Sequence, residues 1–334
     1  MAGVFLLSVA DGGDGDYNRG AYRGLRRSAE AGAFQIHTLT EDPGGADLIL
    51  FAELHGAGPY FEKVRSHPFV RRYREKCFLF SSTPYVIPFL PGVYTSIERR
   101  WATARTRAGS YVGVSENEFV VFSEPAADLP WLYSFLGSTA NASVRRRLRE
   151  LTHPRGFFQD TATDQSRVLA GEFSAEEMRA YSRRYAESIR ASKFVLCPRG
   201  VSPSSVRLFD TMRMGRVPVI LSDQWLAPSG PAWDQFSIRI GETELEQLIP
   251  TLERRESEAV EMARRARAAW DEWFGERACF HRVVEWCLEI KAGRQLPEKW
   301  AHLFPYLHYL RPFHFRHRLR TRYHSLRRQM GRLV

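Results

Sequence analysis

A loop in the middle of the chain gathers residue types that bind anions. Residues 193–223 read KFVLCPRGVSPSSVRLFDTMRMGRVPVILSD: an apolar run, a polar loop, a helical pattern and a second apolar run. The pattern predicts a strand, a loop that carries Arg199, and a helix that begins near Pro203 with Ser202 as its N-cap. A helix N-terminus, hydroxyl groups and a guanidinium at one spot favour a bound phosphate or pyrophosphate.

Two further side chains extend this predicted anion site along the helix. Arg207 and Asp210 stand three positions apart and therefore occupy neighbouring positions on the helix surface. A carboxylate one or two turns from a diphosphate is placed to accept hydrogen bonds from both hydroxyls of a ribose. The same residues also suit a structural role, in which Ser202 caps the helix and the charged side chains form an ion-pair network.

Strand and helix patterns alternate along most of the 334 residues, a length that suits two domains. Apolar runs that predict strands lie at residues 4–10, 46–54, 76–82, 130–138, 156–160, 193–198, 217–222 and 236–240. Continuous apolar runs without strict alternation are typical of parallel strands that are covered on both faces. The sequence therefore predicts two doubly wound α/β domains, residues 1–126 and 127–294, followed by a tail at 295–334.

The segment SKFVLCPRGVSPSSVRLFDTMRMGRVPVILSD resembles the signature of the exostosin family of glycosyltransferases. More than a dozen positions follow the pattern S-K-F-x-L-C-P-R-G-x-x-x-S-S-x-R-L-F-[DE] and its continuation G-x-x-P-V-I-x-S-D. Residues 41–54, 132–151 and 233–245 resemble further elements of the family, so the resemblance spans about residues 41–250. It implies a GT-B fold, in which two Rossmann-like domains face a central cleft, and an inverting glycosyl transfer that usually needs no metal.

The resemblance also assigns roles around the donor substrate, a nucleotide-diphosphate sugar linked to UDP or GDP. It places Arg199, Gly200, Ser204, Ser205 and Arg207 around the diphosphate, Asp210 near the ribose, and Gly137 and Ser138 on a second loop that meets phosphate or sugar. Cationic groups and N–H donors at the leaving diphosphate stabilise charge that develops in the transition state, so no cofactor and no metal is expected. After Asp223 the family usually reads L-P-F and an acidic residue, whereas this chain reads LAPSGPAW, which leaves the donor sugar open.

The base that deprotonates the acceptor is expected from the first domain, across the cleft. Glu53 and His55 in AELHGAG, Asp14 and Asp16 in DGGDGDYN, and Tyr85 all follow predicted strands. Each is a candidate, because spacing alone does not place a group within about 3 Å of an acceptor hydroxyl. The DGD at 14–16 is similar to a metal-binding DXD motif, but its place directly after the first strand favours a Gly-rich loop that leaves room for a sugar.

The formal net charge of +10 is concentrated in the C-terminal tail. Beyond Lys299 there is no Asp or Glu, and eight arginines follow, at 311, 316, 318, 320, 322, 327, 328 and 332. Apolar residues at 315, 319, 323, 326 and 330 predict an amphipathic helix. That helix can pack on the first domain, or residues 311–334 can dock on an anionic membrane beside a lipid-linked glycan acceptor. The nearly balanced charge of the remaining chain argues against a nucleic-acid partner.

The sequence has no run of about 18 apolar residues, and its first residues lack the basic region of a secretory signal. A cytoplasmic protein, peripheral on the inner face of a membrane, is therefore expected. The four cysteines show no metal-ligand spacing and are expected to be reduced and packed. The predicted function is an inverting glycosyltransferase that acts on a glycan or lipid-linked glycan. The alternative is a catalytically inactive partner subunit that binds nucleotide sugars.

Overall fold

The computed structural model contains two parallel β-sheets, one in each half of the chain. It describes residues 1–13, 16–31, 36–54, 59–84, 86–113, 116–312, 314–320 and 323. The first sheet has the strand order β2-β1-β3-β4-β5-β6. Its strands are β2 (Thr38–Leu39), β1 (Gly3–Leu7), β3 (Leu48–Glu53), β4 (Cys77–Ser81), β5 (Gly92–Tyr94) and β6 (Thr106–Ala108).

The second sheet has the order β11-β10-β9-β7-β8, and all of its pairings are parallel as well. Its strands are β11 (Ile238–Arg239), β10 (Val217–Leu221), β9 (Ser192–Pro198), β7 (Trp131–Gly137) and β8 (Gly156–Asp160). In both sheets the strand order reverses next to the first strand, as in doubly wound folds. Two such Rossmann-like domains confirm the predicted α/β class and GT-B architecture.

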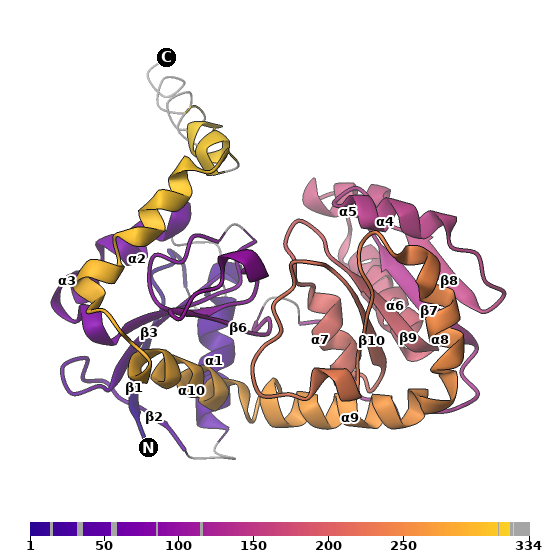
Figure 1. The fold of residues 1–334 in the computed structure, drawn as a ribbon, viewed down its shortest axis with the longest axis horizontal. Coiled ribbons are helices and arrows are strands. Elements are labelled where there is room, and N and C mark those ends of the chain that lie inside the picture. Colours follow the sequence, from indigo (N-terminus) through magenta and orange to yellow (C-terminus); the bar gives the residue numbers. More distant parts are fainter. Residues whose placement is uncertain are drawn as a thin grey trace.

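Helices cover both sheets, and α9 runs beneath the second domain toward the first (Figure 1). The α-helices are α1 (Gly20–Glu30), α2 (Glu62–Ser66), α3 (Pro68–Arg72), α4 (Ser143–Arg147), α5 (Ala162–Leu169), α6 (Ala175–Arg190), α7 (Val206–Arg213), α8 (Leu248–Arg254), α9 (Ala259–Trp273), α10 (Cys279–Ala292) and α11 (Glu298–Ala301).

The chain returns to the first domain after α9, which corrects the predicted domain boundary at residue 294. Helix α10 packs beside α1 and β5, and the amide of Phe280 donates to the hydroxyl of Ser28 at 2.9 Å. The physical reason is burial: Phe280, Val284 and Cys287 of α10 belong to the same apolar core as the inner face of the first sheet. The sequence pattern showed an apolar helix here but not which sheet it covers.

Strand β3 shows why the parallel strands appear as continuous apolar runs. All six of its residues are buried. Leu48 and Leu50 face a core that extends through α1, α10 and α9 into the second domain, whereas Ile49 and Phe51 face a separate core on the opposite side of the sheet. Both faces of the strand are therefore apolar, as expected for a sheet covered on both sides.

Two further expectations concern the whole described chain. The four cysteines, Cys77, Cys197, Cys279 and Cys287, are free and buried, as predicted. Among the described residues, no helix combines the length and the apolar character that crossing a membrane requires.

Candidate functional site

The polar loop between β9 and α7 lies at the carboxyl edge of the second sheet. Helix α7 begins at Val206, three residues later than predicted, and Ser205 is its N-cap residue without a side-chain cap bond. The predicted cap at Ser202 is wrong, because Ser205 still has extended backbone dihedrals (φ −136°, ψ 136°) and the Ser202 hydroxyl donates instead to the carbonyl of Ser204 at 3.2 Å.

A cavity of about 540 Å³ opens between the ends of β7 and β9, and we call it the β7–β9 cavity. It lies at the point where the strand order reverses, which is where open parallel sheets bind ligands. Its lining includes seven of the eight side chains and glycines that the sequence placed around a nucleotide: Gly137, Ser138, Gly200, Ser204, Ser205, Arg207 and Asp210. The site predicted from dispersed residues is therefore brought together by the fold.

Arg207 projects from the first turn of α7 into the floor of this cavity and is only 8% exposed. Its guanidinium donates to the carbonyl of Leu136, and its carbon lies 4.6 Å from the centre of the Phe135 ring. Its Nη1 atom is buried and has no hydrogen-bond partner among the described residues. A Cβ at Gly137 would lie 2.5 Å from the Nη2 atom, so any larger residue there would displace this guanidinium.

Arg145 is a second cation in the cavity, and the sequence analysis did not select it. It comes from α4 and donates to the carbonyls of Ser138 (3.1 Å), Pro198 (3.2 Å) and Arg199 (2.8 Å), which joins the ends of β7 and β9. Burial, together with the nearby charge of Arg207, lowers the pKa of Arg145 to about 10. The signal that could have found it is the Arg-rich segment directly after the Gly137 loop.

Neither of these guanidiniums has a carboxylate within 4.0 Å in the part of the chain that the structure describes. The hydroxyl oxygen of Ser204 is likewise buried without a partner among those residues. Buried polar groups are normally satisfied, and a buried cation without a counter-charge is costly. The cavity therefore has the chemistry of an anion site.

Asp210 lies one turn farther along α7 and is 8% exposed. The hydroxyl of Tyr185, from α6, donates to its Oδ2 atom at 2.8 Å. Burial raises the pKa of Asp210 to about 6, while the Tyr185 bond acts in the opposite direction. Above that pH the side chain is a carboxylate with capacity to accept further hydrogen bonds from a ligand.

Arg199 does not line the β7–β9 cavity, although the sequence placed it at the diphosphate. Its guanidinium makes long bonds of 3.4 Å to the carbonyls of Gly200 and Val201, and it lies 4.0 Å from Glu242. It lines a second cavity, also of about 540 Å³, which we call the Trp101 cavity after a residue of its first-domain wall.

Two first-domain candidates for the base, Glu53 and Asp16, differ in burial and in hydrogen bonding. Glu53 ends β3 at 0% exposure and accepts hydrogen bonds from the hydroxyl of Ser8 (3.0 Å) and the amide of Val9 (2.6 Å). Burial raises the pKa of Glu53 to about 7. Asp16 caps a short 3₁₀-helix by accepting from the amide of Asn18 at 2.7 Å.

Neither Glu53 nor Asp16 lines the β7–β9 cavity or the Trp101 cavity. Asp14, His55 and Tyr85 lie outside the described residues. Across the described ranges, no group of three or more His, Cys, Asp or Glu side chains has a geometry that could hold a metal ion.

Known proteins are similar to the part of the chain that forms the β7–β9 cavity. Residues 120–255 match the family model described as the Exostosin GT47 domain. This segment, about two fifths of the chain, is therefore similar to an exostosin GT47 domain. They include every residue named above around the β7–β9 cavity, from Gly137 to Asp210.

Curated proteins match this chain over short stretches. An exostosin-1 homolog of Caenorhabditis elegans is 37% identical over 86 residues, which cover 24% of this chain and 22% of the relative. A probable glucuronosyltransferase of Oryza sativa subsp. japonica is 30% identical over 113 residues, covering 28% of this chain and 26% of the relative. The chain thus spans about a quarter of the length of these relatives. A solved glycosyltransferase of Rickettsia africae is 9% identical, with a TM-score of 0.39 over 87% of this chain and 99% of that one.

Proposed function

We propose that this exostosin-like chain is an inverting glycosyltransferase whose donor, a nucleotide-diphosphate sugar, binds in the β7–β9 cavity. One observation carries the proposal. Arg145 and Arg207 are both largely buried, neither is paired with a carboxylate among the described residues, and Asp210 lies beside them at the strand-order reversal. A diphosphate supplies the missing negative charge, and a ribose supplies hydroxyls for Asp210.

The proposed reaction exchanges one bond at the donor sugar for another. The oxygen of an acceptor hydroxyl bonds to the anomeric carbon from the face opposite the leaving group, and its proton passes to a base of the chain. The bond between the anomeric carbon and the diphosphate breaks, and its electron pair leaves with the nucleotide. Arg145 and Arg207 stabilise that developing charge, which is a contribution to the transition state itself. No metal is required for this step.

The base in this reaction is proposed from the first domain. Glu53, His55 and Asp16 remain the candidates. Glu53 has a pKa near the operating range of a general base, because burial raises it to about 7. Glu53 is completely buried and bonded to Ser8 and Val9. An acceptor could therefore reach the Glu53 carboxylate only if the segment that carries Ser8 and Val9 moved.

The transferred sugar is proposed to be a hexose or a uronic acid. Three of the curated relatives are named probable glucuronosyltransferases, which favours the uronic acid. The acceptor is proposed to be a glycan or a lipid-linked glycan at the inner face of a membrane, with the basic tail at 311–334 on the membrane surface.

A screen of nucleotide sugars for slow hydrolysis tests the proposed function. We expect released UDP or GDP from one donor and none from the others, because water replaces the acceptor at a low rate. Binding of UDP or GDP without hydrolysis or transfer for any donor would instead support the inactive partner subunit. Absence of binding by either nucleotide would contradict both functions.

A further inference from the structure

The Trp101 cavity lies directly behind the loop that lines the β7–β9 cavity. Its walls come from three parts of the chain. The lining residues are Pro84, Val86, Pro88, Ser96, Ile97, Glu98, Arg100 and Trp101 of the first domain, Arg199, Val201 and Pro203 of the loop after β9, and Arg311, Pro312 and His314 near the C-terminus. Gly200 and Ser202 line the β7–β9 cavity, Arg199 and Pro203 line the Trp101 cavity, and Val201 lines both. The loop thus contributes side chains to both cavities, and Val201 is the residue that lines each of them.

The charge of the Trp101 cavity is strongly positive. Three arginines, Arg100, Arg199 and Arg311, line it together with a single carboxylate, Glu98. Three positive charges and one negative charge leave a formal charge of +2 on these four residues. Glu98 is already bonded to Arg100, and Glu242, which does not line the cavity, lies 4.0 Å from Arg199. Arg199 and Arg311 therefore have no carboxylate at hydrogen-bond distance among the described residues.

Arg311 is held rigidly in the wall of this cavity. Its guanidinium carbon lies 3.1 Å from the centre of the Trp101 ring, and Nη2 bonds to the Nε2 atom of His308 at 3.1 Å. Its Nη1 atom is buried without a partner among the described residues. His314 adds no positive charge near pH 7, because burial, reinforced by the charge of Arg311, lowers its pKa to about 4.

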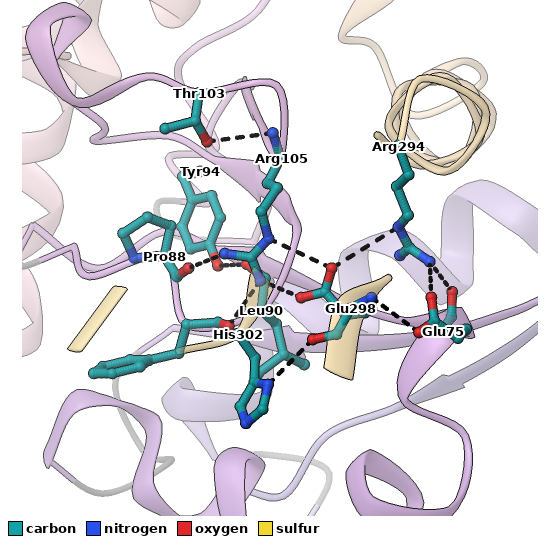
Figure 2. Close-up of polar contacts among 10 residues, drawn as sticks. Glu75, Pro88, Leu90, Tyr94, Thr103, Arg105, Arg294, Glu298 and His302 are labelled. Atoms are coloured by element: carbon teal, nitrogen blue, oxygen red, sulfur yellow. Dashed lines mark hydrogen bonds and ion pairs between the residues drawn. The ribbon is translucent and has the colours of Figure 1, made fainter. Parts of the chain in front are cut away.

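A buried ion cluster fixes the C-terminal segment that brings Arg311 to the cavity. Figure 2 shows the carboxylate of Glu298, only 3% exposed, between Arg105 and Arg294. Arg105 also donates to the carbonyl of Pro88 at 3.4 Å, and Pro88 lines the Trp101 cavity. The segment is thus fastened to the same part of the first domain that forms the cavity wall.

We infer that the Trp101 cavity is the acceptor site and that it takes a glycan acceptor carrying a phosphate group. The location rests on the proposed function, since an acceptor must bind next to the donor and Val201 lines both cavities. The charge favours phosphate: Arg199 and Arg311, which have no hydrogen-bonded carboxylate among the described residues, suit a phosphate ester of about −1.5 to −2 near pH 7 better than a single carboxylate of −1. A volume of about 540 Å³ accommodates a sugar with its phosphate.

The phosphate can come from a diphosphate-linked lipid carrier or from a phosphate-bearing glycan. Calorimetry on the full chain, with the β7–β9 cavity saturated by UDP or GDP, separates the two sources. Geranyl diphosphate represents the lipid source and glucose 6-phosphate the glycan source. Glucose and a uronic-acid disaccharide are the comparison ligands. The variants are Arg311→Gln, Arg199→Gln and, as a matched control, Arg254→Gln, which removes an exposed arginine in α8.

We expect at least one phosphate probe to bind more tightly than glucose and the disaccharide. Arg311→Gln and Arg199→Gln should each weaken that probe at least tenfold and leave nucleotide affinity unchanged, while Arg254→Gln changes neither. If Arg311→Gln lowers the melting temperature, its weaker binding could reflect loss of folded protein, and Arg199→Gln then provides the independent test. Three results, each with normal nucleotide binding, would overturn the inference. They are no binding of either phosphate probe, tighter binding of the disaccharide than of the phosphate probes, and unchanged probe affinity in both variants. Loss of nucleotide binding in the unmodified chain would instead contradict the proposed function.

Discussion

At the scale of single residues, burial without a counter-charge distinguishes Arg207 and Arg145 from most arginines of this chain. Arg149 and Arg155, for example, pair with Asp160 and Glu256 at the surface. In the β7–β9 cavity, backbone carbonyls accept hydrogen bonds from all three nitrogens of the Arg145 guanidinium, but their charge-free oxygens do not neutralise it. The Nη1 atom of Arg207 is buried without a partner among the described residues. An arrangement of this kind is destabilising by itself and is stabilised by an anionic ligand.

Asp210 provides a test of ribose recognition. Asp210→Asn removes a charged acceptor, so UDP or GDP affinity should fall by about 1–2 kcal/mol at pH 7.5, whereas pyrophosphate, which has no ribose, should bind as before. Because burial raises the pKa of Asp210 to about 6, nucleotide affinity of the unmodified chain should also fall as the pH drops below 6. Calorimetry with both ligands measures this, and an equal loss for nucleotide and pyrophosphate would rule out the ribose role.

Glu53 has a second, separable consequence for stability. Its pKa of about 7 in the folded chain lies above the usual value of 4.5, so the folded state binds its proton more tightly than the unfolded state does. The free energy of unfolding should therefore decrease as the pH rises from about 4.5 to about 7. Glu53→Gln has no carboxyl group to titrate and lacks this dependence. On going from pH 5 to pH 8, its free energy of unfolding should therefore rise by about 2 kcal/mol relative to that of the unmodified chain.

Urea denaturation of both proteins at the two pH values measures the change for Glu53. The hydrogen-bond loss in the Gln variant does not vary with pH, so the difference between the two pH values isolates the titration. Parallel pH profiles would show that the carboxyl group is not perturbed. If Glu53 is also the base, the same variant should lower kcat at least 100-fold without weakening nucleotide binding.

The limit of sequence reasoning at this scale is side-chain direction. The strand, loop and helix pattern correctly gathered Ser204, Arg207 and Asp210, because neighbouring positions on one helix and its leading loop share an edge of the sheet. Arg199 turns to the other side of its loop, and Arg145 arrives from α4. The direction in which a loop side chain points depends on backbone dihedrals that residue types alone do not determine.

At the scale of elements, eight of the strands were predicted because each is a continuous apolar run. The strands β2, β5 and β6 were missed, since two or three residues carry no periodicity. Strand β11 is as short as β2 and was predicted only because it lies within the longer segment at 236–240. The helix after β9 was predicted to start at Pro203, where proline is well tolerated, but hydrogen bonding begins at Val206. The return of α10 to the first domain was missed because an apolar stripe does not identify its partner.

The ion cluster around Glu298 should stabilise the C-terminal segment. Glu298→Gln leaves Arg105 and Arg294 largely buried without their shared carboxylate, which should cost about 3 kcal/mol of unfolding free energy. The control is Glu261→Gln, which breaks an exposed pair with Arg265 and should cost less than about 1 kcal/mol. Urea denaturation compares them, and equal small losses would show that the cluster contributes nothing beyond a surface pair.

At the scale of the whole molecule, the basic C-terminal tail at residues 311–334 has no role in the proposed donor site. His314 is buried and its ring bonds to the hydroxyl of Tyr60 at 3.2 Å, whereas Phe315, Leu319 and Tyr323 are 52%, 53% and 62% exposed. These three residues of the predicted apolar stripe therefore leave about half or more of their surface exposed. Leu326, Met330 and the last arginines lie outside the described residues.

An anionic membrane is the partner that we propose for this surface. Full-length protein should co-sediment with anionic but not with neutral vesicles, and high salt should release it, because each arginine near an anionic surface contributes about 1 kcal/mol. Replacing Arg316, Arg318 and Arg320 by Gln should abolish co-sedimentation while leaving nucleotide binding intact. Equal recovery of both proteins in the supernatant would exclude membrane docking by the tail.

The most direct test of the whole account is the affinity of Arg207→Gln for UDP and GDP by calorimetry, with Arg254→Gln as the charge-matched control. If the β7–β9 cavity holds a nucleotide diphosphate, the unmodified chain and the control should bind one of the two nucleotides equally well. Arg207→Gln should bind it at least 30-fold more weakly, which corresponds to about 2 kcal/mol. Unchanged affinity in Arg207→Gln, or no binding of either nucleotide to the unmodified chain, would contradict the account.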